Sequence, residues 1–410
     1  MGGETTAAGS SAASAPALYV VVGALLLALT VAVGGRSDPA ERSTIEALTP
    51  VGDGADGGTA AGGDGADGAD GAEVDAGVGE VESVANTTTT TTTTATPSTT
   101  EPPTGPVTIA FGGDVHFEGF LGQALADEPL TMLDPVADMM ADADLAIINL
   151  ETAITERGSP SAKQFNFRAP PAAFDALRAA GVDVVSMANN HGLDFGPDGL
   201  DDSLLYAAEA DFPVVGIGRN AEEAYAPWST TINGQRIAVI GATQVLDSSL
   251  IATWTATDEQ AGLASAKEVD TLAGAVAAAR DEHDTVIVFL HWGIEGDTCP
   301  APRQLELADT LVEAGADLIV GGHAHRVQGG GRKGDALIHY GLGNFVFYTE
   351  GGAGTTSGVL RVTMDGRRVE DYEWIPARLD RGVATRLTGD EAVAAVSAWD
   401  DLRACTDLSA

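Results

Sequence analysis

Residues 285–295 read TVIVFLHWGIE, and residues 317–325 read DLIVGGHAH. Each stretch is a short run of apolar, mostly branched residues that leads to a histidine. Five further apolar runs occur from residue 107 onward, and Ala/Leu-rich segments with helical spacing lie between them. Strand, then helix, then strand predicts an α/β domain whose strands are buried on both faces.

The expected strands are Val107–Phe111, Leu145–Leu150, Val182–Met187, Arg236–Gly241, Thr285–Leu290, Asp317–Val320 and Ala336–Tyr340. The expected helices are Pro171–Ala180, Asp201–Ala210, Lys267–Asp281 and Arg303–Ala314. Near the C-terminus, two alternating runs flank Asp365-Gly366, which is a hairpin turn signal.

Polar residues follow the expected strands. GGDVH comes after Phe111, Glu151 comes after Leu150, and ANNH comes after Met187. In open α/β sheets, ligands bind beyond the carboxyl ends of the strands, so these side chains should lie together. A single histidine in such a place is usually structural, but five of the seven histidines of the chain lie at these strand ends.

Imidazole and carboxylate together suit borderline divalent metals such as Zn, Mn, Fe and Ni. The candidate ligands are Asp114, His116, Asn149, Glu151, Asn190, His291, His323 and His325. This is more than one tetrahedral ion needs, which favours two metals bridged by a carboxylate and able to activate a water. His191, directly after Asn190, is placed to protonate a leaving group.

The order of these motifs resembles the calcineurin-like metallophosphoesterase superfamily and, more closely, the poly-γ-glutamate capsule synthesis (CapA) family. The resemblance covers about Val107 to Phe347 and rests on six motifs in order: Asn149-Leu-Glu151, Asn189-Asn-His191-Gly-Leu-Asp194-Phe-Gly196, His291-Trp-Gly-Ile-Glu295, Gly322-His-Ala-His325-Arg-Val-Gln328 and Gly343-Asn344-Phe345, preceded by Asp114-Val-His116. It implies a metallo-dependent phosphatase-like fold, a four-layer αββα sandwich, in a membrane-anchored accessory protein of capsule polymer synthesis and export. Capsule-synthesis membrane proteins and an anionic polymer are the implied partners.

The resemblance also implies roles for individual residues. One divalent ion (Mn, Fe or Zn) would take Asp114, His116 and His325, and the other Asn190, His291 and His323. The usual Gly-Asp-x-x-Asp bridge is replaced by Asn149-Leu150-Glu151, so that Glu151 must bridge the metals, and this substitution puts phosphatase activity in doubt. The residues expected to orient ligands or meet substrate are Asn149, Asp194, Glu295, Gln328, Asn344 and Arg168.

The first hundred residues have a different composition. Residues 1–14 are a short tail, and residues 15–35 carry no charge and are just long enough to cross a bilayer core of about 30 Å. A cleaved signal peptide is the alternative, but residues 1–14 lack the basic segment with which one normally begins. Residues 36–104, rich in Gly, Ala, Asp and then Thr, predict a disordered stalk outside the cell. A domain at 105–385 and a C-terminal helical extension at 386–410 follow.

The charge of the chain limits its partners. It has 21 Lys and Arg against 60 Asp and Glu, a formal charge of −39, and the part from Gly105 onward is still at −27. Nucleic acid is excluded as a partner because no basic stripe exists to replace its counterions. An anionic polymer such as poly-γ-glutamate is also repelled by this charge, except where metals dominate locally.

The sequence leaves three readings of the site open. The chain is a two-metal hydrolase acting on a phosphoester or an amide, a non-catalytic surface protein that holds a polymer, or a stalked binding domain with a structural ion. Cys299 and Cys405 are either paired or two unrelated thiols, and the sequence does not decide between these states.

Overall fold

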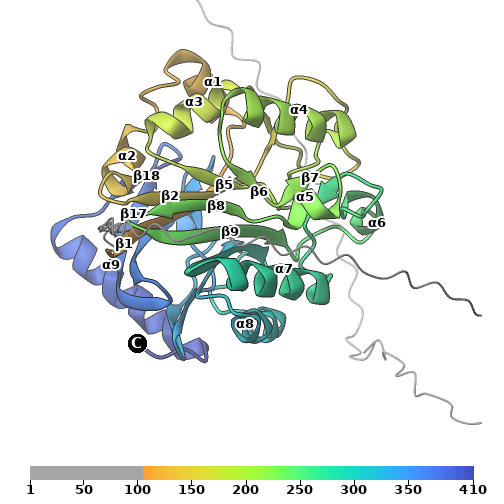
Figure 1. Cartoon of the computed structure of the whole chain (residues 1–410). Helices are drawn as coiled ribbons and strands as arrows, with labels where there is room; N and C mark the ends of the chain where they lie inside the picture. Colours follow the sequence, from red (N-terminus) through yellow and green to blue (C-terminus); the bar gives the residue numbers. More distant parts are fainter. Residues whose placement is uncertain (1–104) are drawn as a thin grey trace, which may run out of the picture. The chain divides into compact units, whose positions relative to one another are not determined.

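The computed structural model describes residues 105–410, so the tail, membrane segment and stalk predicted for residues 1–104 lie outside the described residues. Two β-sheets lie at the centre of this part of the chain (Figure 1). The larger sheet contains, in spatial order, β15 (Asn344–Val346), β18 (Val383–Arg386), β17 (Arg368–Asp380), β16 (Thr356–Asp365), β1 (Val107–Val115), β2 (Leu145–Leu150), β5 (Val184–Ser186) and β6 (Val214–Val215). The smaller sheet contains β13 (Gly330–Lys333), β14 (Ala336–His339), β12 (Leu318–His323), β11 (Thr285–Trp292), β9 (Gln235–Thr243) and β8 (Trp228–Ile232).

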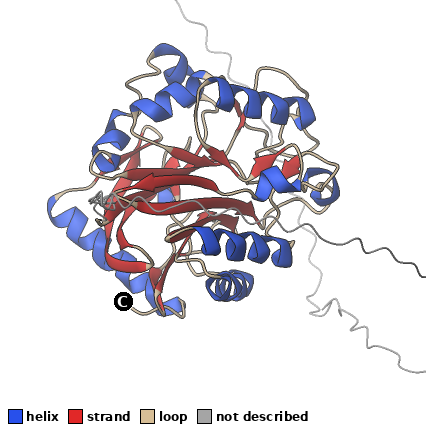
Figure 2. Cartoon of the chain, in the orientation of Figure 1, coloured by secondary structure: helices blue, strands red, loops and turns tan. Residues whose placement is uncertain are grey.

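Helices cover the outer faces of both sheets (Figure 2). The larger sheet packs against α1 (Phe120–Asp127), α2 (Asp134–Met140), α3 (Ala172–Ala179) and α4 (Gly196–Glu209). The smaller sheet packs against α7 (Val269–Glu282) and α8 (Pro302–Ala314). The remaining elements are α5 (Ala221–Tyr225), α6 (Ile251–Trp254), α9 (Gly389–Leu402), the 3₁₀ turns η1 (Gly352–Thr355) and η2 (Arg403–Cys405), and the strand pairs β3 (Ala153–Ile154) with β4 (Arg168–Ala169) and β7 (Ile217–Gly218) with β10 (Gly262–Leu263).

The two sheets pack face to face through an apolar core. Phe111 and Ile147 of the larger sheet belong to the same buried cluster as Ile287 and Phe289 of the smaller one. Separate apolar clusters lie between each sheet and its helices. The result is the four-layer αββα sandwich, and the predicted fold class is therefore confirmed.

Parallel strands bring the functional residues to one end of the sandwich. β1, β2, β5 and β6 run parallel to one another, as do β9, β11, β12 and β14. At the opposite end, the described chain begins where Gly105 donates its N–H to the carbonyl of Asn233, which in turn donates from its amide to the Pro106 carbonyl. β1 then runs from that end to Asp114.

The expected C-terminal helical extension, residues 386–410, contains α9. Trp399 of this helix is buried, stacks on Trp374 of β17, and donates its indole N–H to His339 at 2.9 Å. A disulfide joins Cys299 to Cys405, which settles the alternative that the sequence left open. No helix within residues 105–410 is both long and apolar enough to cross a membrane.

Candidate metal centre

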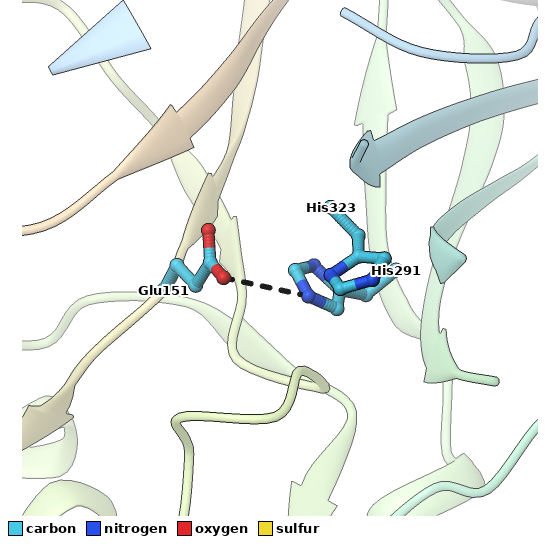
Figure 3. Close-up of side chains that lie close together, drawn as sticks. All are labelled: Glu151, His291 and His323. Atoms are coloured by element: carbon cyan, nitrogen blue, oxygen red, sulfur yellow. Dashed lines mark ion pairs between the residues drawn. The ribbon is translucent and has the colours of Figure 1, made fainter. Parts of the chain in front are cut away.

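Acidic and imidazole side chains from the two sheets meet where β1, β2, β11 and β12 end. The potential ligand atoms of Glu151, His291 and His323 all lie within 4.8 Å of one another (Figure 3). Two further groups meet the same limit. One is Asp114 with Glu151 and His325, and the other is Glu295 with His323 and His325. The Glu151 carboxylate lies 3.5 Å from His291 Nε2, the contact drawn as a dashed line in Figure 3.

Glycine and unusual backbone angles make this meeting of the sheets feasible. A Cβ on Gly322 would lie 2.2 Å from Asp114 Oδ1, so only glycine allows β12 to approach β1 so closely. His323 and His325 both have positive φ, 86° and 51°. Non-glycine residues seldom adopt this conformation, and such strain concentrates at functional sites.

Several buried polar atoms of the centre have no hydrogen-bond partner. They are both carboxylate oxygens of Glu151 and Nδ1 of His323. Burial raises the pKa of Glu151 well above its usual range and lowers the pKa of His323 to about 3. A buried carboxylate and a neutral imidazole without partners are costly unless something binds them. Carboxylate and imidazole donors fit a divalent cation of the Zn, Mn or Fe class.

Asp114 connects the two sheets by hydrogen bonds. Its carboxylate accepts the amide N–H of Asn149 at 2.8 Å and the backbone N–H of His323 at 3.0 Å. His325 Nδ1 lies 3.1 Å from Asp114 and 2.9 Å from the side-chain oxygen of Asn344. The other nitrogen of this imidazole, Nε2, is left facing Glu151 at 3.9 Å. Burial opposes a charge on His325, but Glu151 and Asp114 outweigh it and raise its pKa to about 9.

His291 is oriented by two asparagines. Its Nδ1 lies 3.0 Å from the amide nitrogen of Asn149, and its Nε2 lies 2.6 Å from the side-chain oxygen of Asn190. Asn149 is itself held by Asn189, whose amide donates to it at 3.1 Å. Asn149 therefore acts behind the ligands, where it fixes both Asp114 and His291, as such outer partners commonly do.

His191 has its own supporting group at the side of the centre. Its Nδ1 lies 2.5 Å from Asp194, and Lys163 contacts the same carboxylate at 2.6 Å. The ring stacks on Phe167 at 3.9 Å, and its Nε2 lies 3.9 Å from Glu151. Burial raises the pKa of Asp194 to about 7 against the opposing effect of Lys163, and burial together with Lys163 lowers the pKa of His191. His191 thus faces the centre from a fixed position.

The structure does not bring His116 into any of the three ligand groups. Its Nδ1 accepts the backbone N–H of Glu118 at 3.0 Å, and its ring packs against Phe167, Phe347 and Tyr348. The predicted ligand role of His116 therefore stays a prediction.

Three other residues were predicted to orient the ligands or to meet substrate, and the structure places them as follows. Arg168 is exposed and lies over the ring of Phe195, and Glu295 is exposed beside His323 and His325. Gln328 is buried and donates to the carbonyls of Asp297 and Cys299.

Lys163, Phe167 and Asn189 support the centre but were not predicted to do so. The only signal for Lys163 is its rarity, since the chain has three lysines. Asn189 stands within a motif already recognised, and nothing in the local pattern distinguishes Phe167.

The model of the bacterial capsule synthesis protein family PGA_cap matches residues 108–349, more than half of the chain. The chain belongs to this family. The capsule biosynthesis protein CapA of Bacillus anthracis is 38% identical over 189 residues, which are 45% of this chain and 45% of that protein. The PGA biosynthesis protein CapA of Bacillus subtilis is 29% identical over 248 residues, which are 59% and 63% of the two chains.

This PGA_cap protein therefore spans about half to two thirds of the length of these relatives. Among solved structures, a putative 5′-nucleotidase from Staphylococcus aureus aligns with a TM-score of 0.42 at 18% identity, covering 72% of this chain and 58% of that one. The resemblance drawn from the sequence motifs is confirmed at the level of the family.

Proposed function

We propose that this protein assists the synthesis of an anionic capsule polymer outside the cell, as a metal-dependent hydrolase of an amide or phosphoester bond. The unpartnered, buried carboxylate of Glu151, surrounded by His291, His325 and His191, carries this proposal. The choice of polymer rests on the names of the relatives, since one of them is a PGA biosynthesis protein.

The residues of the chain would divide the work as follows. Asp114, Glu151, Asn190, His291, His323 and His325 would hold one or two divalent cations. A cation there supplies Lewis-acid polarisation of the bond to be cleaved. His191 would exchange a proton with the reacting groups through Nε2, while Asp194 fixes the ring through Nδ1. Lys163 holds Asp194 in place and favours its ionised form against the effect of burial.

An extracellular location is part of the proposal. The disulfide between Cys299 and Cys405 supports it, because such bonds persist mainly in oxidising compartments. The uncharged segment at residues 15–35 would anchor the protein to the bilayer as a single-pass membrane protein. Protease treatment of intact cells tests this, and full protection of the C-terminal domain would refute it.

A second candidate function is the holding of the polymer without cleavage. One observation favours it: His116 packs among aromatic rings and lies outside the ligand groups, which leaves fewer donors for a second ion. The resemblance to the metallophosphoesterase superfamily implied hydrolysis by two metal ions. A site that holds a single ion therefore favours binding of the polymer without cleavage.

Metal analysis and cleavage assays on the same preparation separate the two functions. The protein is purified without chelator, its metal content is measured by mass spectrometry, and it is incubated with poly-γ-glutamate and with a generic phosphodiester. His191→Ala should retain the metal and lose cleavage by at least about a hundredfold. His283→Ala, at the end of α7 and away from the centre, is the matched control. Bound metal without cleavage of either compound would favour the holding function, and absence of metal would refute the proposed hydrolysis.

A further inference from the structure

A groove of about 290 Å³ lies between α9 and the β16–β17 hairpin. Its apolar wall includes Trp374 and Trp399, and the small side chains of Ala395 and Ala398 leave room along the helix. Two cations, Arg326 and Arg378, also line it. A groove that combines apolar surface with guanidinium groups suits a ligand that has both methylene groups and anions.

The two arginines of the groove are poorly neutralised. Arg326 makes no ion pair with any acid in residues 105–410, and its guanidinium donates only to the carbonyl of His325. Arg378 has one acidic neighbour, Glu391 at 3.9 Å, and both side chains are more than half exposed. Such exposed pairs contribute little. In a domain with a formal charge of −27, two available cations in one groove form a local site for anions.

The groove adjoins the metal centre through a shared segment. Ser357, which lines the groove, donates its hydroxyl to the backbone carbonyl of Asn344 at 2.6 Å. The side chain of the same Asn344 orients His325 at 2.9 Å. Arg326 follows His325 directly, so the wall of the groove and the edge of the centre are parts of one loop system.

The walls of the groove are held in place from both sides. Thr298 lies on one wall beside Cys299, whose disulfide to Cys405 joins this loop to the segment that follows α9. Trp399 is fixed by its hydrogen bond to His339. A preformed groove binds an extended chain at a lower entropic cost than a flexible surface would.

We infer that this groove binds a stretch of the carboxylate-bearing polymer, with Arg326 and Arg378 pairing with its carboxylates and the tryptophan wall contacting its methylene groups. The inference rests on the proposed function for the identity of the polymer, and it makes the groove a second contact point beside the metal centre.

Binding of short γ-linked glutamate oligomers to the chelator-treated full chain tests the inference, because metal then contributes nothing. The readouts are calorimetry at low salt and the tryptophan fluorescence of the chain, to which Trp374 and Trp399 contribute two of five residues. Arg378→Gln should weaken binding about tenfold, as expected for a lost charge-assisted hydrogen bond. Ala398→Trp should abolish binding by filling the groove while leaving both arginines. Arg303→Gln, an exposed cation of α8 outside the groove, is the charge-matched control and should bind as the wild type does.

Two results would overturn the inference. The first is wild-type affinity in both Arg378→Gln and Ala398→Trp together with loss of binding in Glu151→Gln, which would place the polymer at the metal centre alone. The second is equal binding of polyphosphate that Ala398→Trp does not change, which would indicate general attraction of anions. Lack of metal or of cleavage would refute the proposed hydrolysis but would leave these binding results unaffected, so the two failures are distinguishable.

Discussion

Replacing Glu151 with glutamine tests the metal centre most directly. The substitution keeps the shape of the side chain and removes its charge. Both carboxylate oxygens are buried without hydrogen-bond partners, so no hydrogen bond is lost, although the charge that faces His325 is removed. Residues behind metal ligands contribute about 10- to 100-fold to affinity, and a ligand should contribute at least the upper value.

The size of the effect on stability follows from linkage. At a metal concentration of about 100 times its dissociation constant, the wild type gains about 2.7 kcal/mol. A variant that binds about a hundredfold more weakly gains only about 0.4 kcal/mol. For a domain of this size the wild type should melt roughly 5 °C higher with metal, and Glu151→Gln should melt roughly 1 °C higher.

The metal-free proteins should differ in the opposite direction. The pKa of Glu151 is raised in the folded state, so its favourable contribution is complete below its ordinary value of 4.5 and is lost as the pH rises through the folded value. Metal-free Glu151→Gln should therefore equal or exceed the wild type in stability at pH 8. Metal uptake by the wild type should also release a proton, because the ligand carboxylate must be ionised.

Calorimetric melting with and without metal, and metal analysis after dialysis, measure these effects. Glu156→Gln, the same substitution at an exposed position nearby, is the control. Wild-type metal content in Glu151→Gln would refute the ligand role of Glu151. A metal-free variant that is less stable than the metal-free wild type by more than about 1 kcal/mol would refute the cost of burying this carboxylate.

Three further predictions concern other parts of the described chain. His116→Ala should change metal affinity by less than about tenfold in a metal titration; a loss as large as that of Glu151→Gln would make His116 a ligand. Replacing Cys299 and Cys405 with serine should lower the free energy of urea unfolding by about 4 kcal/mol, because the bridge spans a sequence separation of 106; an unchanged midpoint would contradict the pairing. Burial lowers the pKa of His339 to about 3, so its contribution to stability is present above its ordinary value of 6.5 and is lost as the pH falls. His339→Phe should therefore flatten the acid-induced loss of stability seen in urea unfolding, and an equally steep loss in the variant would contradict this.

The strands were predictable because burial on both faces gives continuous apolar runs. The run at Leu145–Leu150 coincides with β2, and the run beginning at Thr285 becomes β11, which extends to Trp292. β8 was missed because it is an edge strand of alternating exposure with few branched apolar residues. α4 begins at Gly196 rather than at Asp201, since Pro197 is well suited to the first turn of a helix.

The candidate site was predictable to the extent that strand ends determine it. The grouping of Glu151, His291 and His323 follows from the carboxyl ends of parallel strands. The direction of the His116 side chain does not follow from this rule. β1 ends at Val115, so the alternation of side chains along a strand no longer applies to the next residue. Lys163 could not be found in this way, since it lies in a loop and reaches Asp194 only through the tertiary fold.

β1 connects the point where the described chain enters the domain to the metal centre. The described chain enters at Gly105, held by Asn233, and β1 then runs through the sandwich to Asp114, roughly 30 Å away at about 3.3 Å per residue. Any pull transmitted through residues 1–104 therefore acts at the end of the domain remote from the metal centre. On the proposed function, a membrane tether attached there would leave the metal centre at the end of the domain remote from the membrane, open to a long polymer.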